Sequence, residues 1–191
     1  MNPRPAEASD GAAPPTAARV LVAGVGNIFL RDDGFGPEVA RRLASEPRLL
    51  TSDVRVVDYG IRGMHLAYDL LDDVDVLVLA DAVPSSAASS LEEGKQHGSA
   101  AGSIRVIKIR PEDLDGRAAL DPHGMNPAAV LGRLRSLGGE LPTTYLVGCV
   151  PADVSEGIGL SEPVSAAVPE AVAAVVSILA RHAAVHPSVT A

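Results

Sequence analysis

Cysteine is almost absent from the sequence: Cys149 is the one example in 191 residues. A single cysteine excludes an internal disulfide framework and a cysteine-rich zinc or iron–sulfur site. Aromatic residues make up only 3% of the chain and tryptophan is missing, which argues against stacking platforms for bases or sugars. No uninterrupted apolar run reaches about 18 residues, so we expect no membrane span.

Positive charge is also scarce. The chain has 16 Lys and Arg against 24 Asp and Glu, a net charge of -8 with neutral histidines. Nucleic-acid binding needs a clustered positive surface, so nucleic acid is not an expected partner. Apolar residues, by contrast, make up 47% of the chain. That content and length suit one globular domain that buries a core without crosslinks.

The two ends of the chain are predicted to be tails. Residues 1–18 hold four prolines and many alanines. They lack the apolar segment of a signal peptide, and we expect a disordered N-terminal tail. Residues 19–184 form the single predicted domain, and residues 185–191 form a short C-terminal tail. Within the domain, residues 84–102 are rich in Ser, Ala and Gly without an apolar period, which predicts a flexible excursion between strands.

Strand and helix patterns alternate through this domain. Near-continuous apolar runs are typical of strands covered on both faces, whereas the alternation over 104–109 indicates a half-exposed strand near an edge. The predicted strands are 19–25, 53–59, 74–80, 104–109 and 143–150, and the predicted helices are about 33–44, 64–71, 127–137 and 161–184. Pro169 predicts a kink or a late start in the last helix. The order favours an α/β fold: a three-layer α/β/α sandwich around a mostly parallel five-stranded sheet, with room for one antiparallel strand at the edge.

The turn after the first strand begins Gly24-Val25-Gly26, like a dinucleotide fingerprint. Phe29 stands where that fingerprint needs a third glycine, and the acids Asp32 and Asp33 lie where phosphates would arrive. A nucleotide site is therefore the weaker interpretation. The simpler one is that the glycines turn the chain while Asp32 caps the following helix. Two adjacent acids exceed what one cap requires, so Asp33 remains a candidate functional residue.

Three chemistry-bearing side chains follow three different predicted strands. Asp33 follows the first strand, Asp81 comes directly after residues 74–80, and His123 lies in a turn-rich loop before the helix at 127. Taken singly, Asp81 could cap its own turn and a loop histidine is usually just solvated. Because sites in such sheets collect at the carboxyl ends of strands, we expect the three to share a site. Two carboxylates and an imidazole can hold a divalent metal and leave positions open.

The other candidate groups do not fit this pattern. The remaining histidines, His65, His97, His182 and His186, do not share the strand-end position. Cys149 lies within a predicted strand and is most simply a small buried apolar residue. The sequence contains no G-x-S-x-G elbow that would mark an activated serine.

At these residues the chain resembles the hydrogenase maturation endopeptidases. The resemblance covers nearly everything from Arg19 to about Ala184. Its motifs are Val22-Ala23-Gly24-Val25-Gly26-Asn27, Asp32-Asp33-Gly34-x-Gly36, Asp58-Tyr59-Gly60-x-x-Gly63, Ala80-Asp81-Ala82, Pro122-His123, Val147-Gly148-x-x-Pro151 and Gly157-x-Gly159-Leu160. The first two blocks are specific when joined to the later Asp and His.

The resemblance implies a cytoplasmic protease that removes a C-terminal extension from the large subunit of nickel–iron hydrogenase after nickel insertion. It implies that the enzyme senses nickel carried by that precursor, although another divalent metal would suit the same groups. The family's metal-contacting, catalytic positions fall on Asp33, Asp81 and His123. Some members carry Glu at the first position, and the shorter Asp33 keeps the carboxylate while changing its reach.

Two further expectations come from the resemblance. Asp58 is interpreted as an acid that supports the site residues without contacting the metal. The 84–102 excursion, long for the family, lies where the substrate would dock, and two interpretations of it stay open: it contributes to partner choice, or it is simply disordered. Two alternatives stay open at this point: a non-catalytic metal-sensing maturation chaperone, and another hydrolase or nucleotide-binding enzyme on the same fold. Only product formation would separate the first from a protease.

Overall fold

The computed structural model describes residues 18–49, 51–83, 100–113 and 127–182. Residues 1–17 of the predicted N-terminal tail, the whole predicted C-terminal tail, most of the 84–102 excursion and His123 therefore lie outside the described residues.

The described strands form one five-stranded sheet in the order β2-β1-β3-β5-β4. Its strands are β1 (Val20–Val25), β2 (Val54–Gly60), β3 (Val76–Ala82), β4 (Ile104–Ile109) and β5 (Thr143–Cys149). Four strands run parallel, and β4 runs antiparallel to β5 at the edge. The mostly parallel sheet with an antiparallel edge strand is confirmed.

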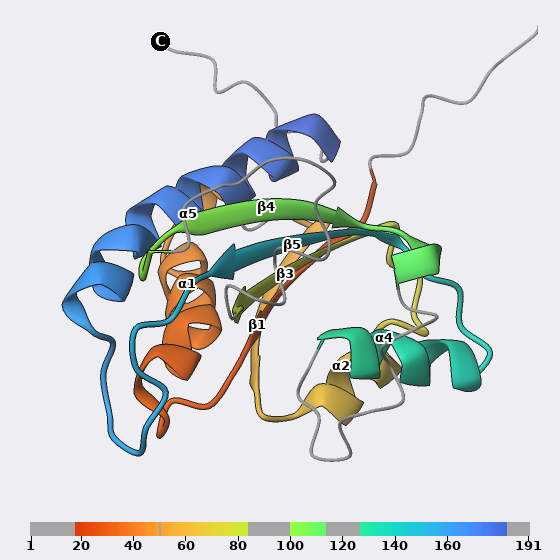
Figure 1. Ribbon diagram of the computed structural model, residues 1–191. Helices are drawn as coiled ribbons and strands as arrows, with labels where there is room; N and C mark the ends of the chain where they lie inside the picture. Colours follow the sequence, from red (N-terminus) through yellow and green to blue (C-terminus); the bar gives the residue numbers. More distant parts are fainter. Residues whose placement is uncertain (1–17, 50, 84–99, 114–126, 183–191) are drawn as a thin grey trace, which may run out of the picture.

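Helices cover both faces of the sheet, which confirms the three-layer sandwich (Figure 1). On one face α1 (Phe35–Ala44) packs beside α5 (Glu162–His182), and on the other α2 (Gly63–Asp69) packs beside α4 (Pro127–Ser136). Three short 3-10 turns complete the described elements: η1 (Arg31–Gly34), η2 (Pro47–Leu49) and η3 (Pro111–Asp113).

Alternating side chains of the sheet feed two separate apolar cores. Val20 and Val22 of β1 pack into the core under α1 and α5, while Leu21 and Ala23 pack into the core under α2 and α4. Because successive side chains of a strand point to opposite faces, a strand covered on both sides has no polar position. This burial explains the unbroken apolar run that marks β1 in the sequence.

The last helix, α5, runs from Glu162 to His182 with Pro169 inside it. Of the two expected effects of Pro169, a kink or a late start, the late start is therefore wrong. Proline removes one backbone hydrogen bond, to the carbonyl four residues earlier. Pro169 and Ser165 are both exposed, so water can satisfy that carbonyl. By length and composition α5 could cross a membrane, but a stripe of its residues, including Val164, Val168 and Ile178, is buried in the core. That stripe is typical of a core helix.

Candidate active site

Four parallel strands end at one edge of the sheet, here called the carboxyl edge. From β1 the chain passes through α1 to β2 on one side, whereas the strands that follow β3 lie on the other side, so the strand order reverses between the neighbouring strands β1 and β3. Ligand sites of open α/β sheets lie at such a point. A cavity of about 440 Å³ lies elsewhere, at the opposite edge, where Arg19, Asp53 and Asp73 help to line it. It includes none of the predicted site residues.

Gly26 and Gly36 allow η1 and α1 to pack closely against the end of β1. A side chain at Gly26 would overlap the backbone carbonyl of Asp33, and one at Gly36 would overlap the carbonyl oxygens of Val25 and Ala80. Gly26 also has a φ of 135°, which glycine tolerates and side-chain-bearing residues rarely do. The glycines therefore serve close packing of the turn, and this packing explains them without a phosphate.

Asp33 lies in η1 and is half-buried. Its Oδ2 accepts a hydrogen bond of 2.6 Å from the backbone N–H of Asn27, in the turn that leaves β1. The carboxylate does not cap α1, since neither η1 nor α1 has a side-chain cap. The strand-exit turn thus folds back on Asp33 and holds its carboxylate at the carboxyl edge.

Asp81 lies inside β3, opposite Gly148 of β5, and is only 8% exposed. The sequence predicts that Asp81 follows a strand ending at residue 80, and this is wrong, because β3 continues to Ala82 and includes Asp81. Burial raises the pKa of Asp81 well above its usual range. The nearby Asp33 carboxylate raises this pKa further, while the Ala82 backbone N–H acts to lower it.

The structure thus brings two of the three predicted residues into electrostatic contact. Like charges in a buried setting disfavour double ionisation, so this pair gains from a shared proton or from an added cation. Within the described ranges no group of three or more His, Cys, Asp and Glu stands ready to hold a metal. His123, the third predicted ligand, lies outside those ranges, and its membership of the site stays a prediction.

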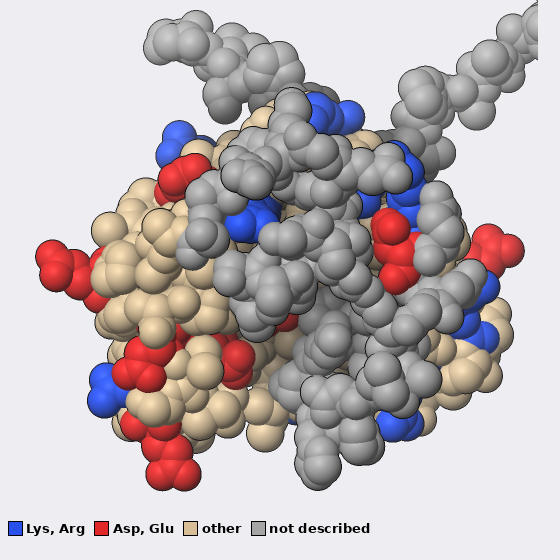
Figure 2. Space-filling model, in the orientation of Figure 1, with Lys and Arg blue, Asp and Glu red and all other residues tan. Residues whose placement is uncertain are grey.

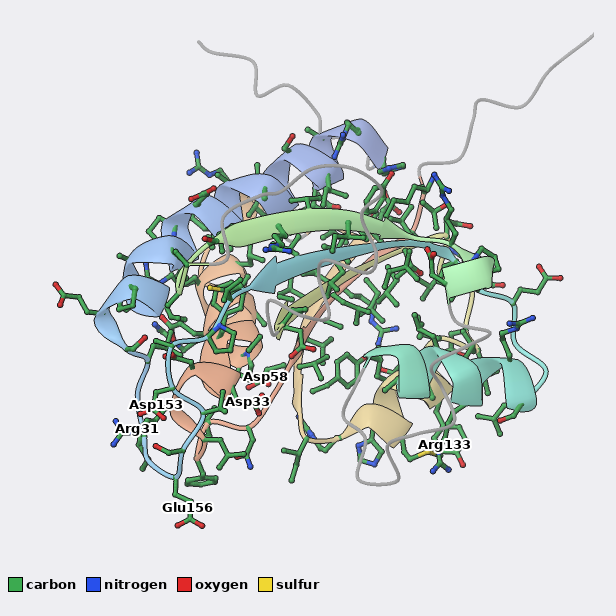
Figure 3. The ribbon with its side chains drawn as sticks, in the orientation of Figure 1. Arg31, Asp33, Asp58, Arg133, Asp153 and Glu156 are labelled. Atoms are coloured by element: carbon green, nitrogen blue, oxygen red, sulfur yellow. The ribbon has the colours of Figure 1, made fainter. Side chains whose placement is uncertain are left out.

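Asp58 is exposed near the end of β2, beside the same edge. Its Oδ1 accepts a hydrogen bond of 2.8 Å from the Gly60 N–H, and the Gly60 carbonyl in turn accepts one of 3.1 Å from the Gly26 N–H. Figure 3 labels Asp58 and Asp33 at this end of the sheet, beside α1. A supporting role for Asp58 toward the site stays a prediction.

Asp32 has a structural role that the sequence did not suggest. It was expected to cap the helix, but its fully buried carboxylate instead accepts hydrogen bonds from the loop between β5 and α5. The donors are the backbone N–H groups of Ala152 (2.8 Å), Asp153 (2.9 Å) and Ser161 (2.6 Å) and the Ser161 hydroxyl (2.9 Å). Burial acts to raise the pKa of Asp32, but these bonds outweigh it and the pKa is lowered. Asp32 therefore anchors that loop to η1.

The remaining candidates behave as expected where the structure describes them. Cys149 is buried at the end of β5, and burial raises the pKa of its thiol to about 12, so it is not an activated nucleophile. His65 is exposed on α2, and His182 pairs with the Tyr145 hydroxyl at 3.0 Å. Neither belongs to the site.

The sequence is similar to those of known proteins. A family model described as hydrogenase maturation protease matches residues 37–178. The chain is 31% identical to the hydrogenase 2 maturation protease of Escherichia coli K12, covering 84% of this chain and 90% of that one. It is 27% identical to the hydrogenase expression/formation protein HupD of Rhizobium leguminosarum, covering 87% and 76% of the two chains.

Solved structures agree with the sequence matches. The hydrogenase maturating endopeptidase HybD of Escherichia coli superposes with a TM-score of 0.66 at 30% identity, covering 85% of this chain and 93% of that one. A hydrogenase 2 maturation peptidase from a thaumarchaeotal archaeon gives a TM-score of 0.58 at 31% identity, covering 84% and 97%. With most of both lengths matched in sequence and in structure, the chain belongs to the hydrogenase maturation protease family and is a peptide-bond hydrolase.

Proposed function

We propose that this protease removes the C-terminal extension of the large-subunit precursor of a nickel–iron hydrogenase, in the cytoplasm and after nickel insertion. The observation that carries the proposal is the pair of carboxyl groups at the carboxyl edge: Asp81 is buried inside β3 with Asp33 nearby, and burial first and the Asp33 charge second raise the pKa of Asp81. A cation placed beside the two carboxyl groups would stabilise their ionised forms. A nickel ion already bound in the precursor would supply that cation.

The donor set suits a metal that arrives with the substrate. Two carboxylates with one imidazole, from Asp33, Asp81 and His123, lack the thiolate ligands that hold soft metals tightly. Such a set can touch a metal that the precursor already holds without removing it. Contact with the ion would fix the adjoining peptide bond at the carboxyl edge, where a carboxylate can accept the proton of an attacking water.

Site variants test this assignment. Asp33→Asn, Asp81→Asn and His123→Ala are expected to abolish release of the C-terminal peptide from nickel-loaded precursor, measured as a mass change by mass spectrometry. Asp72→Asn is the matched control, since Asp72 is an exposed acid just before β3, at the opposite end of the sheet from the carboxyl pair. We expect it to cleave like the wild type. Full activity in any of the three site variants would remove that residue from the mechanism.

A further inference from the structure

Two loops at the carboxyl edge are joined into one surface. The first is residues 27–31, after β1, and the second is residues 153–158, after β5. They form a parallel bridge between Leu30 and Gly157. In that bridge the Gly157 N–H donates to the Phe29 carbonyl at 2.8 Å and the Arg31 N–H donates to the Gly157 carbonyl at 3.1 Å. An ion pair of 3.2 Å between Arg31 and Asp153 is a further contact that holds the two loops together.

This loop pair exposes an apolar surface. Ile28 is 51% exposed, Phe29 62%, Val154 51% and Ile158 79%. The chain has only two phenylalanines, and the other one, Phe35, is fully buried. Large apolar side chains gathered on one exposed surface are a usual mark of an interaction site. The position of these four, on loops anchored by backbone bonds and by buried Asp32, indicates a preformed surface.

The apolar surface is coupled directly to the site. The Phe29 N–H donates to the Asn27 side-chain oxygen at 3.0 Å, and the Asn27 N–H donates to the Asp33 carboxylate at 2.6 Å. Two hydrogen bonds through Asn27 therefore connect Phe29 to the Asp33 carboxylate, so a peptide bound on Phe29 lies close to the site. An occupant of this surface is held within reach of the groups that would cut it.

The charge of the loop pair selects the kind of occupant. Arg31 is already paired with Asp153, while Glu156 projects from the tip of the second loop (Figure 3). Figure 2, in the same orientation, shows mostly acidic groups beside the uncharged surface in this region. Acidic groups beside apolar side chains complement an apolar segment that carries basic residues.

We propose that the loop pair is the docking surface for the hydrogenase precursor, which binds through an apolar segment flanked by basic residues. This inference rests on the proposed function, because it takes the precursor as the substrate. It adds that recognition uses contacts of the precursor's protein surface with Phe29 and Ile158, apart from any contact between the metal and the carboxylates.

The test compares the double variant Phe29→Ser/Ile158→Ser with Leu137→Ser. Leu137 is also an exposed apolar residue, but it lies outside the loop pair: it is 43% exposed just beyond the end of α4, away from the carboxyl edge. Precursor binding is measured by isothermal titration and cleavage by steady-state kinetics, with Tm as the check on folding. We expect the double variant to raise both the Kd for the precursor and KM at least about tenfold, while kcat changes less than about twofold. The control should match the wild type.

The outcomes separate this inference from the proposed function. A wild type that binds the precursor through this surface but never cuts it overturns the function and supports the docking surface. A double variant with wild-type Kd and KM overturns the docking surface even if cleavage occurs, and a wild type that does not bind the precursor overturns both. Sedimentation tests the remaining alternative, that the surface binds a second copy of this chain. If the wild type is a dimer, the double variant is a monomer and both have the same Kd for the precursor, the surface is a dimer interface and the proposal is overturned.

Discussion

Asp81 and Asp32 are both buried carboxyl groups, yet their surroundings have opposite effects. Asp81 faces another carboxylate and its pKa is raised by burial first and by Asp33 second. Asp32 is surrounded by donors from the β5–α5 loop, which overcome the effect of burial and lower its pKa. The first arrangement destabilises a charge that function can use, and the second stabilises a charge that holds the fold together.

Replacing Asp81 by asparagine should abolish cleavage without destabilising the protein at neutral pH. A carboxyl group whose folded-state pKa is raised stabilises the fold at low pH and loses that contribution as pH rises through the raised pKa. Asparagine does not ionise, so the stability of Asp81→Asn relative to the wild type should increase from about pH 4 upward. Urea unfolding across pH measures it. A variant that loses stability relative to the wild type as pH rises would contradict this picture.

Replacing Asp32 by asparagine should be strongly destabilising, by about 2 to 4 kcal/mol at neutral pH. The amide offers one acceptor oxygen where four donors converge, and its NH₂ group meets backbone N–H groups. Because the pKa of Asp32 is lowered, its contribution is complete above the usual value of 3.8 and is lost in acid as pH falls through the lowered pKa. The deficit of Asp32→Asn should therefore shrink in acid.

Urea unfolding also measures the Asp32 effect, with Glu156→Gln as the control. Glu156 is exposed in the same part of the chain, and its substitution should change stability by less than about 0.5 kcal/mol. Equal stability of the two variants would show that the Asp32 hydrogen bonds do not hold the loop.

At the scale of elements, the position of α1 decides where Asp33 stands. Gly36, in the first turn of α1, lies against the carbonyl oxygens that end β1 and precede Asp81 in β3. No side chain fits between them. The helix can therefore approach the sheet closely enough to bring η1, and with it Asp33, beside Asp81.

Gly36→Ala should move α1 away from the sheet, because the added methyl overlaps backbone atoms that cannot rotate aside. We expect a loss of about 3 kcal/mol in the free energy of unfolding, together with reduced cleavage. Gly138→Ala is the comparison. Gly138 has a φ of 83° but nothing within 4 Å of an added Cβ, so only the backbone cost of about 1 kcal/mol applies. Thermal unfolding of both variants measures the difference, and a smaller loss for Gly36→Ala would contradict the close-packing argument.

The elements that the sequence predicts well are those whose burial leaves a pattern. Parallel strands covered on both faces need apolar residues throughout, and β4 shows the alternation of a half-exposed edge strand, so its bounds, Ile104–Ile109, match the prediction. Short 3-10 turns such as η2 have no such pattern and were missed. They depend on local backbone geometry that no periodicity records.

The candidate site was predictable in part for the same kind of reason. Asp33 and Asp81 could be found because each stands near the exit of an apolar strand. The role of Asp32 could not, since its partners Ala152 and Asp153 are 120 and 121 residues away in sequence. Only the packing of the β5–α5 loop onto η1 brings those donors to one carboxylate.

At the scale of the whole molecule, the carboxyl edge collects three features that the sequence keeps apart. Asp33 and Asp81 come from different strand exits, the apolar loop pair lies beside them, and Asp32 fixes one loop to the other. A macromolecular substrate needs both a docking surface and reactive groups within reach. The reversal of strand order between β1 and β3 places them together at this end of the sheet.

The most direct measurement of nickel-dependent processing compares two forms of one precursor, nickel-loaded and nickel-free, incubated with the wild-type protease and read by the mass of the large subunit. Because the carboxyl pair gains contact energy only when the ion is present, we expect the nickel-loaded form to be cut at least about 100-fold faster, which corresponds to about 2.7 kcal/mol in the barrier. Equal rates for the two forms would contradict nickel sensing and would indicate a peptidase that does not use the substrate's metal.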